Sequence, residues 1–136
     1  MAIHTAQCDC GQASLAIDGE PRFVNACACR KCQRQGSGPI GIGVFFPEQA
    51  LVEKTGTLQA YARKTDNGND AVRYFCPQCG SALYWHTTGV PGHIGVSWGA
   101  LNNPELFAPN WLVWARSLPS WVCLDDIKRY ETQPAS

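Results

Sequence analysis

Cysteines are the residues of this chain whose number and spacing suggest chemistry. Eight occur in 136 residues, and seven fall into three short groups, Cys8-x-Cys10, Cys27-x-Cys29-x2-Cys32 and Cys76-x2-Cys79. Only Cys123 stands alone. Neighbours within a group are too close in sequence to pair easily as disulfides, whereas clustered thiolates are good zinc ligands. The spacing therefore predicts metal sites rather than a disulfide framework.

The first and last groups predict one structural zinc site. Gly11 follows Cys10 directly, and the segment from Cys76 to Gly80, CPQCG, has the form of a zinc knuckle with two thiolates on a tight turn. A closed structural site uses four thiolates, so each pair would supply half of it. A shared ion would join the beginning of the chain to its middle, with a stabilising effect comparable to the ~4 kcal/mol of a long-loop disulfide. The alternative is that Cys8 and Cys10 are merely small buried residues.

The middle group predicts a different kind of site. Cys27, Cys29 and Cys32 offer three thiolates with no fourth partner nearby in sequence. Three protein ligands and one exchangeable position are typical of catalytic zinc, and soft ligands favour a thiol in that position. In the alternative, a side chain closes the tetrahedron and the site is inert. The candidates for that closing ligand are Cys123, His4, His86 and His93.

Short β-like segments, separated by Gly, Pro, Asn and Asp, must position these groups. Their β-branched and aromatic content predicts strands at Ala13–Ile17, Arg22–Ala26, Ile40–Phe46, Leu58–Arg63, Ala71–Phe75, Ala82–His86, His93–Val96 and Trp111–Ala115. A turn is expected over Thr65–Asp70, where Asn67-Gly68 accepts positive φ. Helical turns are expected at Arg30–Gln35 and Asp125–Tyr130, and Gln133–Ser136 is expected to fray. The predicted fold is mostly β.

Composition limits the class of protein. With 45% hydrophobic and 16% charged residues, the chain fits one packed domain over residues 1–136. Lys plus Arg and Asp plus Glu number 11 each, which disfavours nucleic acid as a partner. The longest apolar run, Ile40–Phe46, is far below the ~18 residues of a membrane span. The N-terminus shows no signal peptide, so we expect a cytoplasmic protein.

Several side chains have two possible roles. Arg30, Lys31 and Arg34 either meet the carboxylates of a tripeptide thiol or form a solvated helix face. The five tryptophans either wall a pocket or belong to the core, which is their commoner place in a small β domain. We expect His86 and His93 to be ordinary strand and loop residues, and Cys123 to be a small buried residue.

The cysteine pattern resembles that of the glutathione-dependent formaldehyde-activating enzyme family, which also contains centromere protein V. The resemblance covers nearly the whole chain. Beyond the cysteines it includes Gly36-Ser37-Gly38-Pro39, Leu83-Tyr84-Trp85, Trp114 and Ser117-Leu118-Pro119-Ser120-Trp121. Many relatives have a polar residue, often His, where this chain has Ala28, and a His where it has Leu112.

The resemblance implies a β-rich, tent-like fold with two zinc ions, one structural and one catalytic. Carried over by position, the structural ligands are Cys8, Cys10, Cys76 and Cys79, and the catalytic ligands are Cys27, Cys29 and Cys32. The implied activity joins glutathione and formaldehyde to S-(hydroxymethyl)glutathione, formally a carbon–sulfur lyase reaction in reverse. Its partners are therefore a small thiol and an aldehyde.

Two alternative functions, from classes other than enzymes, are also considered. The first is a non-catalytic, zinc-stapled interaction module in which both zinc ions are structural. The second is a zinc-ribbon nucleic-acid binder, which has the right knuckle but the wrong charge. The fourth ligand of the middle zinc separates the enzyme from the module, because a protein side chain there would close the site.

Overall fold

The computed structural model describes residues 2–124 and 126–134. The strands are β1 (Ile3–Gln7), β2 (Ser14–Asp18), β3 (Phe23–Cys27), β4 (Gly41–Pro47), β5 (Leu51–Thr55), β6 (Gln59–Lys64), β7 (Asp70–Phe75), β8 (Ala82–Thr87), β9 (His93–Ser97), β10 (Trp111–Val113) and β11 (Lys128–Arg129). The helical elements are α1 (Arg30–Gly36) and the single turns η1 (Glu48–Ala50), η2 (Trp98–Ala100), η3 (Pro104–Leu106) and η4 (Ala115–Ser117). The fold is mostly β, as predicted.

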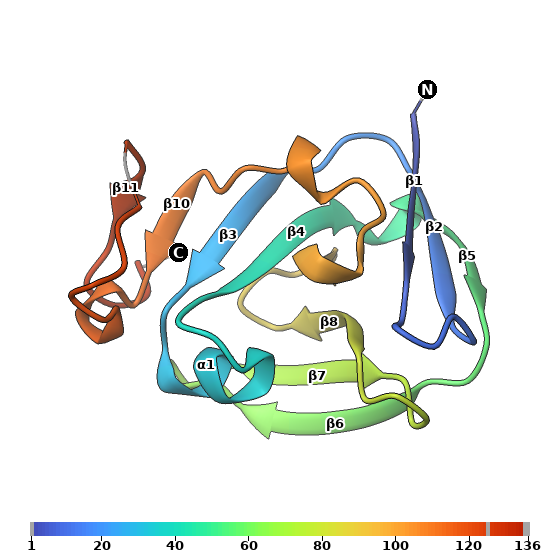
Figure 1. The fold of residues 1–136 in the computed structure, drawn as a ribbon, viewed down its shortest axis with the longest axis horizontal. Coiled ribbons are helices and arrows are strands. Elements are labelled where there is room, and N and C mark those ends of the chain that lie inside the picture. The colour runs from blue at the N-terminus through green and yellow to red at the C-terminus, as the bar shows by residue number, and fades with distance from the viewer. Residues whose placement is uncertain (1, 125, 135–136) are drawn as a thin grey trace.

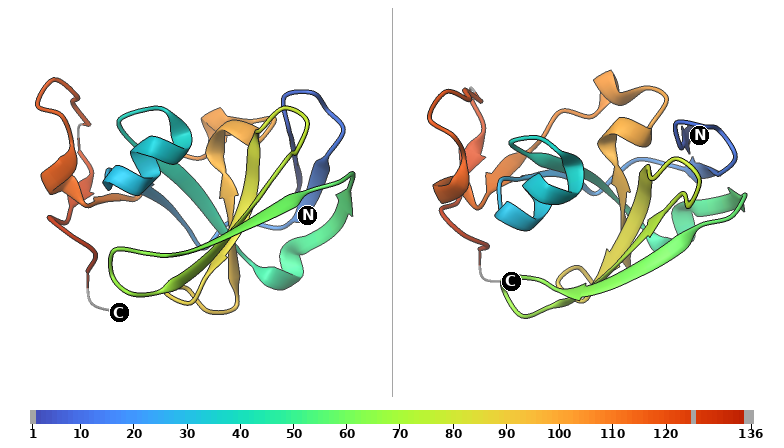
Figure 2. Two further views of the ribbon diagram at one scale, coloured as in Figure 1. Left: turned by 90° about the horizontal axis from the view of Figure 1, so that it is seen from below. Right: turned by 60° about the horizontal axis from the view of Figure 1, so that its bottom comes forward.

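The strands form two sheets (Figure 1). The smaller has the order β1-β2-β5, and the larger has the order β11-β10-β3-β4-β9-β8-β7-β6. Neighbours pair antiparallel, except that β10 runs parallel to both β3 and β11. Figure 2 shows that the larger sheet is strongly twisted, since β6 and β7 cross the direction of β3 and β4.

The main core packs one face of the larger sheet against the smaller sheet. On the larger sheet, Val24, Val44 and Val96 face each other across β3, β4 and β9 and are buried. Leu15 and Ile17 of β2 belong to the same cluster. Because successive side chains of a strand point to opposite faces, the residues directly before and after each of these valines point to the other face. That second face bears the candidate site.

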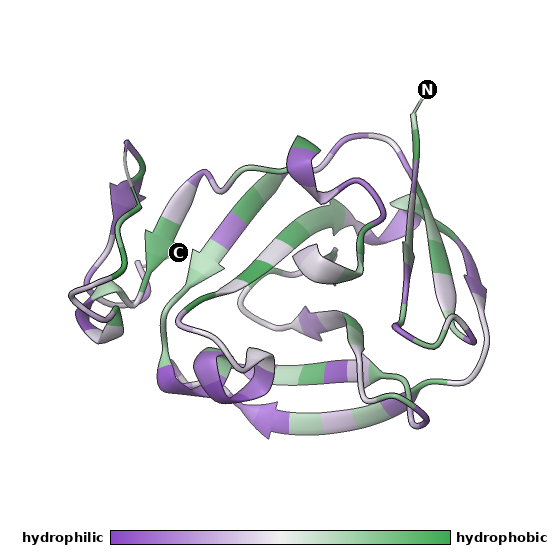
Figure 3. Ribbon diagram, in the orientation of Figure 1, coloured by the Kyte–Doolittle hydropathy of each residue, from purple (hydrophilic) through white to green (hydrophobic). Residues whose placement is uncertain are grey.

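Most of the predicted elements are confirmed. The eight predicted strands are present with ends shifted by two residues or fewer, and α1 begins at Arg30 as expected. The turn between β6 and β7 is closed by hydrogen bonds from the Thr65 and Gly68 amides to the Asn69 and Thr65 carbonyls. Figure 3 shows α1 as mainly hydrophilic, consistent with a short helix on the surface.

Three strands were missed, and one helical prediction is wrong. Strands β1, β5 and β11 were not predicted. The helical turn expected at Asp125–Tyr130 is replaced by β11, where Lys128 pairs with Trp111 of β10. Residue 125 lies outside the described residues, as do 135–136 of the expected frayed end. No helix in the described ranges 2–124 and 126–134 is long and apolar enough to cross a membrane.

Candidate functional site

Two cysteine pairs from distant parts of the chain meet in one cluster. The sulfurs of Cys8, Cys10, Cys76 and Cys79 all lie within 4.8 Å of one another. The Cys8–Cys10 and Cys10–Cys76 sulfur separations are 3.6 Å and 3.7 Å. A zinc ion with Zn–S bonds of about 2.3 Å requires sulfurs about 3.8 Å apart, whereas a disulfide requires about 2.05 Å. These free thiols are therefore spaced for zinc, and we call them the four-thiol cluster.

Tight turns direct backbone amides at the sulfurs of this cluster. Between β1 and β2, the Ala13 amide donates to the Cys8 sulfur at 3.4 Å. Between β7 and β8, the Gln78 amide donates to the Cys76 sulfur at 3.4 Å. The second turn closes with a hydrogen bond from the Gly80 amide to the Cys76 carbonyl, and Gly80 adopts a φ of +81° that favours glycine. Both turns provide amides for thiolates, as zinc sites commonly do.

Side chains of the same two turns also stabilise thiolates here. The Ser81 hydroxyl lies 3.3 Å from the Cys79 sulfur and lowers the pKa of that thiol to about 6. Burial opposes ionisation of Cys76, but the Gln12 side-chain amide, 3.0 Å from its sulfur, and neighbouring backbone amides outweigh this and lower its pKa. Cys76 and Cys79 are thus favoured as thiolates, the form in which cysteine binds metal.

The middle group forms a second cluster at the junction of β3 and α1. Cys27 ends β3, Cys29 caps the N-terminus of α1 and Cys32 lies in its first turn. Their three sulfurs lie within 4.8 Å of one another, and the Cys32 amide donates to the Cys29 sulfur at 3.3 Å. We call these residues the three-thiol cluster. Its donors, like those of the first cluster, are soft ligands suited to zinc.

The three thiols divide protons unequally. Hydrogen bonds donated by Cys27 and Cys32 to the Cys29 sulfur lower the pKa of Cys29 to about 2. The hydrogen bonds of Cys27 with Cys29 and Cys32, together with burial, raise the pKa of Cys27. The hydrogen bond from Cys27 lowers the pKa of Cys32. The hydrogen bond to Cys29, burial and the negative charge of Cys29 outweigh it and raise the pKa of Cys32 to about 12. Without metal, the contacts within this cluster favour ionisation of Cys29 and protonation of Cys27 and Cys32.

Among residues 2–124 and 126–134, no further Cys, His, Asp or Glu joins the three-thiol cluster. Cys123 is exposed, which corrects the expectation that it is buried. His4 packs edge-on against Phe107 at 5.1 Å, in the main core. His86 lies on β8 against Tyr74, and His93 contacts the Pro91 carbonyl. Both are ordinary strand residues.

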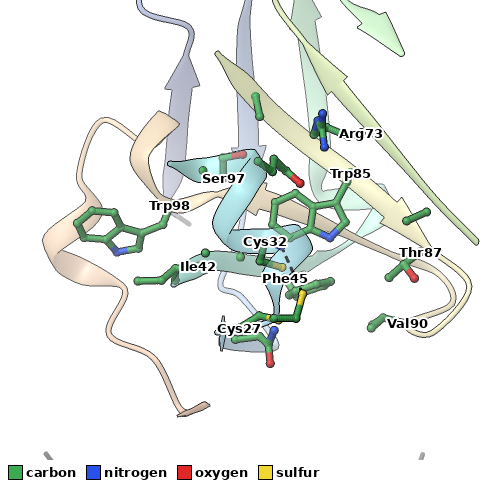
Figure 4. A pocket seen from close by; sticks show the side chains of 18 of the residues that line it. Cys27, Cys32, Ile42, Phe45, Arg73, Trp85, Thr87, Val90, Ser97 and Trp98 are labelled. Carbon is green, nitrogen blue, oxygen red and sulfur yellow. Dashed lines mark hydrogen bonds between the residues drawn. The ribbon is translucent and has the colours of Figure 1, made fainter. Parts of the chain in front are cut away.

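The three-thiol cluster opens onto a large cleft. Cys27, Cys29 and Cys32 line a cavity of about 1110 Å³ on the second face of the larger sheet. Figure 4 shows Cys27 and Cys32 on one side of the Trp85 indole and Arg73 on the other. The cavity also reaches Cys8, so it extends from the three-thiol cluster toward the four-thiol cluster.

A row of aromatic side chains lines this cleft. Phe23 stacks on Trp111 and on Phe45, with ring centroids 5.2 Å and 4.7 Å apart. Phe45 then meets Trp85 edge-on at 5.8 Å. The four residues come from β10, β3, β4 and β8, and all line the cavity. The cleft therefore offers a broad apolar surface beside the thiols.

Comparison with known proteins agrees with this site. Residues 3–117 match the glutathione-dependent formaldehyde-activating enzyme family. The chain belongs to this family. No curated protein matches the chain. A crystal structure of a Rhodobacter sphaeroides protein matches with a TM-score of 0.59 and 22% identity, covering 77% of this chain and 96% of the other, which supports the fold alone.

Membership in the glutathione-dependent formaldehyde-activating enzyme family supports that function in general, and the cysteine clusters could hold zinc. The side chains of Ala28 and Leu112, the two departures noted in the sequence, do not line the cleft. Ala28 and Leu112 are completely buried in a second core cluster with Ala26. Polar side chains at these positions would need partners within that core.

Most tryptophans lie outside their expected place in the core, and the basic residues of α1 take one of the two roles considered for them. Trp85, Trp98, Trp111 and Trp114 line the cleft rather than only filling the core, whereas Trp121 is 77% exposed. None of the basic residues of α1 lines the cleft: Lys31 pairs with Asp66, while Arg30 and Arg34 are exposed. This favours the solvated helix face over contact with substrate carboxylates.

Two arginines that line the cleft were missed by the sequence analysis. Arg63 of β6 and Arg73 of β7 are half-buried there. Burial and the charge of Arg63 lower the pKa of Arg73. The available signal was strand alternation: Arg73 shares its face of β7 with Ala71 and Phe75, so its charge stands among apolar side chains. Only the pairing of the strands shows that this face is a cleft.

Proposed function

We propose that this protein joins glutathione to formaldehyde, giving S-(hydroxymethyl)glutathione. In this reaction a carbon–sulfur bond forms, the carbonyl π bond breaks and the thiol proton is transferred to the new hydroxyl oxygen. The supporting observation is that Cys27, Cys29 and Cys32 form a group of only three thiols, among the described residues, on the wall of a large cleft. The reaction class is a carbon–sulfur lyase reaction in reverse.

The two clusters have different roles in this proposal. Cys8, Cys10, Cys76 and Cys79 hold a structural zinc ion, and Cys27, Cys29 and Cys32 hold a catalytic one. A zinc ion with three thiolate ligands supplies an exchangeable position that stabilises a further thiol as thiolate at neutral pH. Residues 1–136 act as one domain.

The chain itself contributes orientation and shelter. The Cys32 amide fixes the Cys29 sulfur, and β3 and α1 fix the backbone on either side of the cluster. The aromatic row that ends at Trp85 shields one wall of the cleft from water. Partial exclusion of water strengthens the interaction of a bound thiolate with nearby charges and dipoles.

The alternative of a zinc-stapled interaction module requires a side chain that closes the second zinc site. Cys123 is exposed and does not belong to the three-thiol group, and neither does any of the histidines in the described residues. This observation supports the enzyme over the module. It does so because a site with three protein ligands retains a position for substrate.

The test uses protein loaded with two equivalents of zinc. Nuclear magnetic resonance should show accelerated exchange of ¹³C-formaldehyde with glutathione for the wild type and for Cys123→Ser, which alters an exposed thiol. Cys29→Ala should abolish the acceleration. In calorimetry, S-methylglutathione should bind at least ~10-fold more weakly than glutathione, because a thioether has no proton to lose. Equal affinities, or unchanged exchange in Cys29→Ala, would overturn the proposal.

A further inference from the structure

Arg63 and Arg73 lie on the same face of the sheet as the cleft. In the β6–β7 pairing, Arg73 is opposite Tyr61, and Arg63 lies two residues further along β6. Residues directly opposite each other point to one face, and the diagonal neighbour shares it, at about 7–8 Å between backbones. Both arginines belong to the lining of the cavity that contains the three-thiol cluster.

Neither arginine has an acidic partner in the part of the chain that the structure describes. Within residues 2–124 and 126–134, the ion pairs include neither Arg63 nor Arg73. Arg63 donates to the Lys64 carbonyl at 3.4 Å, and the Arg73 guanidinium lies 4.9 Å from the centre of the Tyr61 ring. Asp66, which also lines the cleft, is paired with Lys31.

Two half-buried cations that form no ion pair with a carboxylate in the described residues favour an anionic ligand. Burial removes part of the water around each guanidinium, and the charge of Arg63 makes the charged form of Arg73 less favourable, which is why its pKa is lowered. An anion between them would neutralise this repulsion. Guanidinium groups bind carboxylates through two parallel hydrogen bonds, so a carboxylate suits the site particularly well.

The arginines also have a defined place relative to the thiols. Arg73 is the register partner of Trp85, which lies between it and the labelled cysteines in Figure 4. Cys32 borders the start of β4, because a Cβ added at Gly41 would lie 3.4 Å from the Cys32 Cβ. A ligand extended across the Trp85 indole can therefore have its sulfur at the thiols and an acid group at the arginines.

We propose that Arg63 and Arg73 form a carboxylate-binding subsite for the thiol substrate. The subsite rests on the proposed function and adds a requirement to it: the thiol bears a carboxylate, as a peptide thiol does. It replaces the basic residues of α1 as the origin of that selectivity. A neutral thiol of the same size fills the cleft but leaves the arginines unpaired.

The experiment measures how strongly the zinc-loaded protein prefers glutathione to its diethyl ester, in which both carboxylates are blocked. In the wild type we expect a preference of at least ~10-fold, as one charge-assisted hydrogen-bonded contact provides. Arg73→Gln should reduce the preference to about 2-fold or less, and Arg73→Lys should retain part of it. Arg34→Gln, on α1 and outside the cleft, should leave it unchanged.

Failure of this subsite is distinguishable from failure of the proposed function. If zinc–thiol binding is wrong, glutathione and S-methylglutathione bind equally, yet Arg73→Gln still weakens both. If the subsite is wrong, the acid-over-ester preference is the same in Arg73→Gln and wild type, while S-methylglutathione remains the weaker ligand. Should Arg73→Gln not fold, Arg63→Gln decides by the same ratio, which a purely structural role would not change.

Discussion

Trp85 on β8 lies over Gly95, its register partner on β9. A Cβ at Gly95 would lie 2.6 Å from Cε2 of the indole and 2.9 Å from its Nε1. At Gly43 on β4 a Cβ would lie 2.5 Å from the same ring. The indole therefore occupies space that exists only because two neighbouring strands have glycine there, and this places a large aromatic surface on the cleft wall.

Gly95→Ala should displace Trp85. The contact is too short for any real Cβ, and the atom that it meets belongs to a rigid ring, so overpacking should cost about 1–3 kcal/mol of unfolding free energy. Urea titration followed by tryptophan fluorescence measures this, and glutathione affinity should fall as well. Gly99→Ala is the control, because a Cβ there meets nothing within 4 Å. Equal stabilities of the two variants would contradict the close contact.

Cys76→Ser should remove the structural zinc and most of the folded protein. The Cys76 sulfur is fully buried and accepts hydrogen bonds from Gln12 and Gln78, so its loss leaves those donors facing an incomplete site. Metal binding in such sites is coupled to folding by about 10 kcal/mol or more. Zinc content and thermal unfolding are the measurements, with the exposed Cys123→Ser as control. A folded Cys76→Ser protein with normal zinc content would refute the four-thiolate site.

Gln12→Leu should weaken the four-thiol cluster without removing a ligand. The Gln12 side chain donates to the Cys76 sulfur and the Thr57 carbonyl and accepts from the Thr57 amide. Loss of such supporting contacts typically lowers metal affinity about 10–100-fold. Competition with a chelator of known affinity tests this. An unchanged zinc affinity would show that the hydrogen bonds have no role in holding the metal.

Zinc binding to the three-thiol cluster should release about two protons across a wide pH range. Cys29, with its pKa lowered to about 2, is already a thiolate, whereas Cys27 and Cys32 have raised pKa values and remain protonated. Affinity should therefore rise with pH, about 100-fold per unit from pH 6 to 9, because each bound zinc must displace two protons.

Calorimetry in buffers of different ionisation enthalpy counts these protons for the second zinc equivalent. Three independent thiols of ordinary pKa, about 8.5, would release nearly three protons at pH 7 and about one at pH 9. A release that falls in this way would disprove the shared-proton arrangement of Cys27, Cys29 and Cys32. The four-thiol cluster is loaded by the first zinc equivalent, so it does not contribute to the protons released by the second.

The sequence by itself determined the cysteine clusters and most of the strands. The spacing Cys27-x-Cys29-x2-Cys32 is local, so a strand end and one helical turn are enough to bring the three sulfurs within 4.8 Å. The CPQCG segment likewise forms its turn from neighbouring residues, with Gly80 at positive φ. Strands with β-branched and aromatic residues were found for the same reason, since their preference is mainly local.

Only the tertiary structure decided what surrounds the thiols. From the sequence alone, Trp85 was expected in the core, and basic residues of α1 were candidates for binding substrate carboxylates because they lie nearest the cysteines in sequence. Strand register instead brings Arg73 beside Trp85 and Trp85 over Gly95, all from strands whose pairing depends on the whole sheet. β11, which pairs through only two residues, was predicted as helix because its two-residue ladder has no pattern of its own. Local preferences form turns and strands, but which faces meet depends on long-range pairing and burial, and that is where this cleft arises.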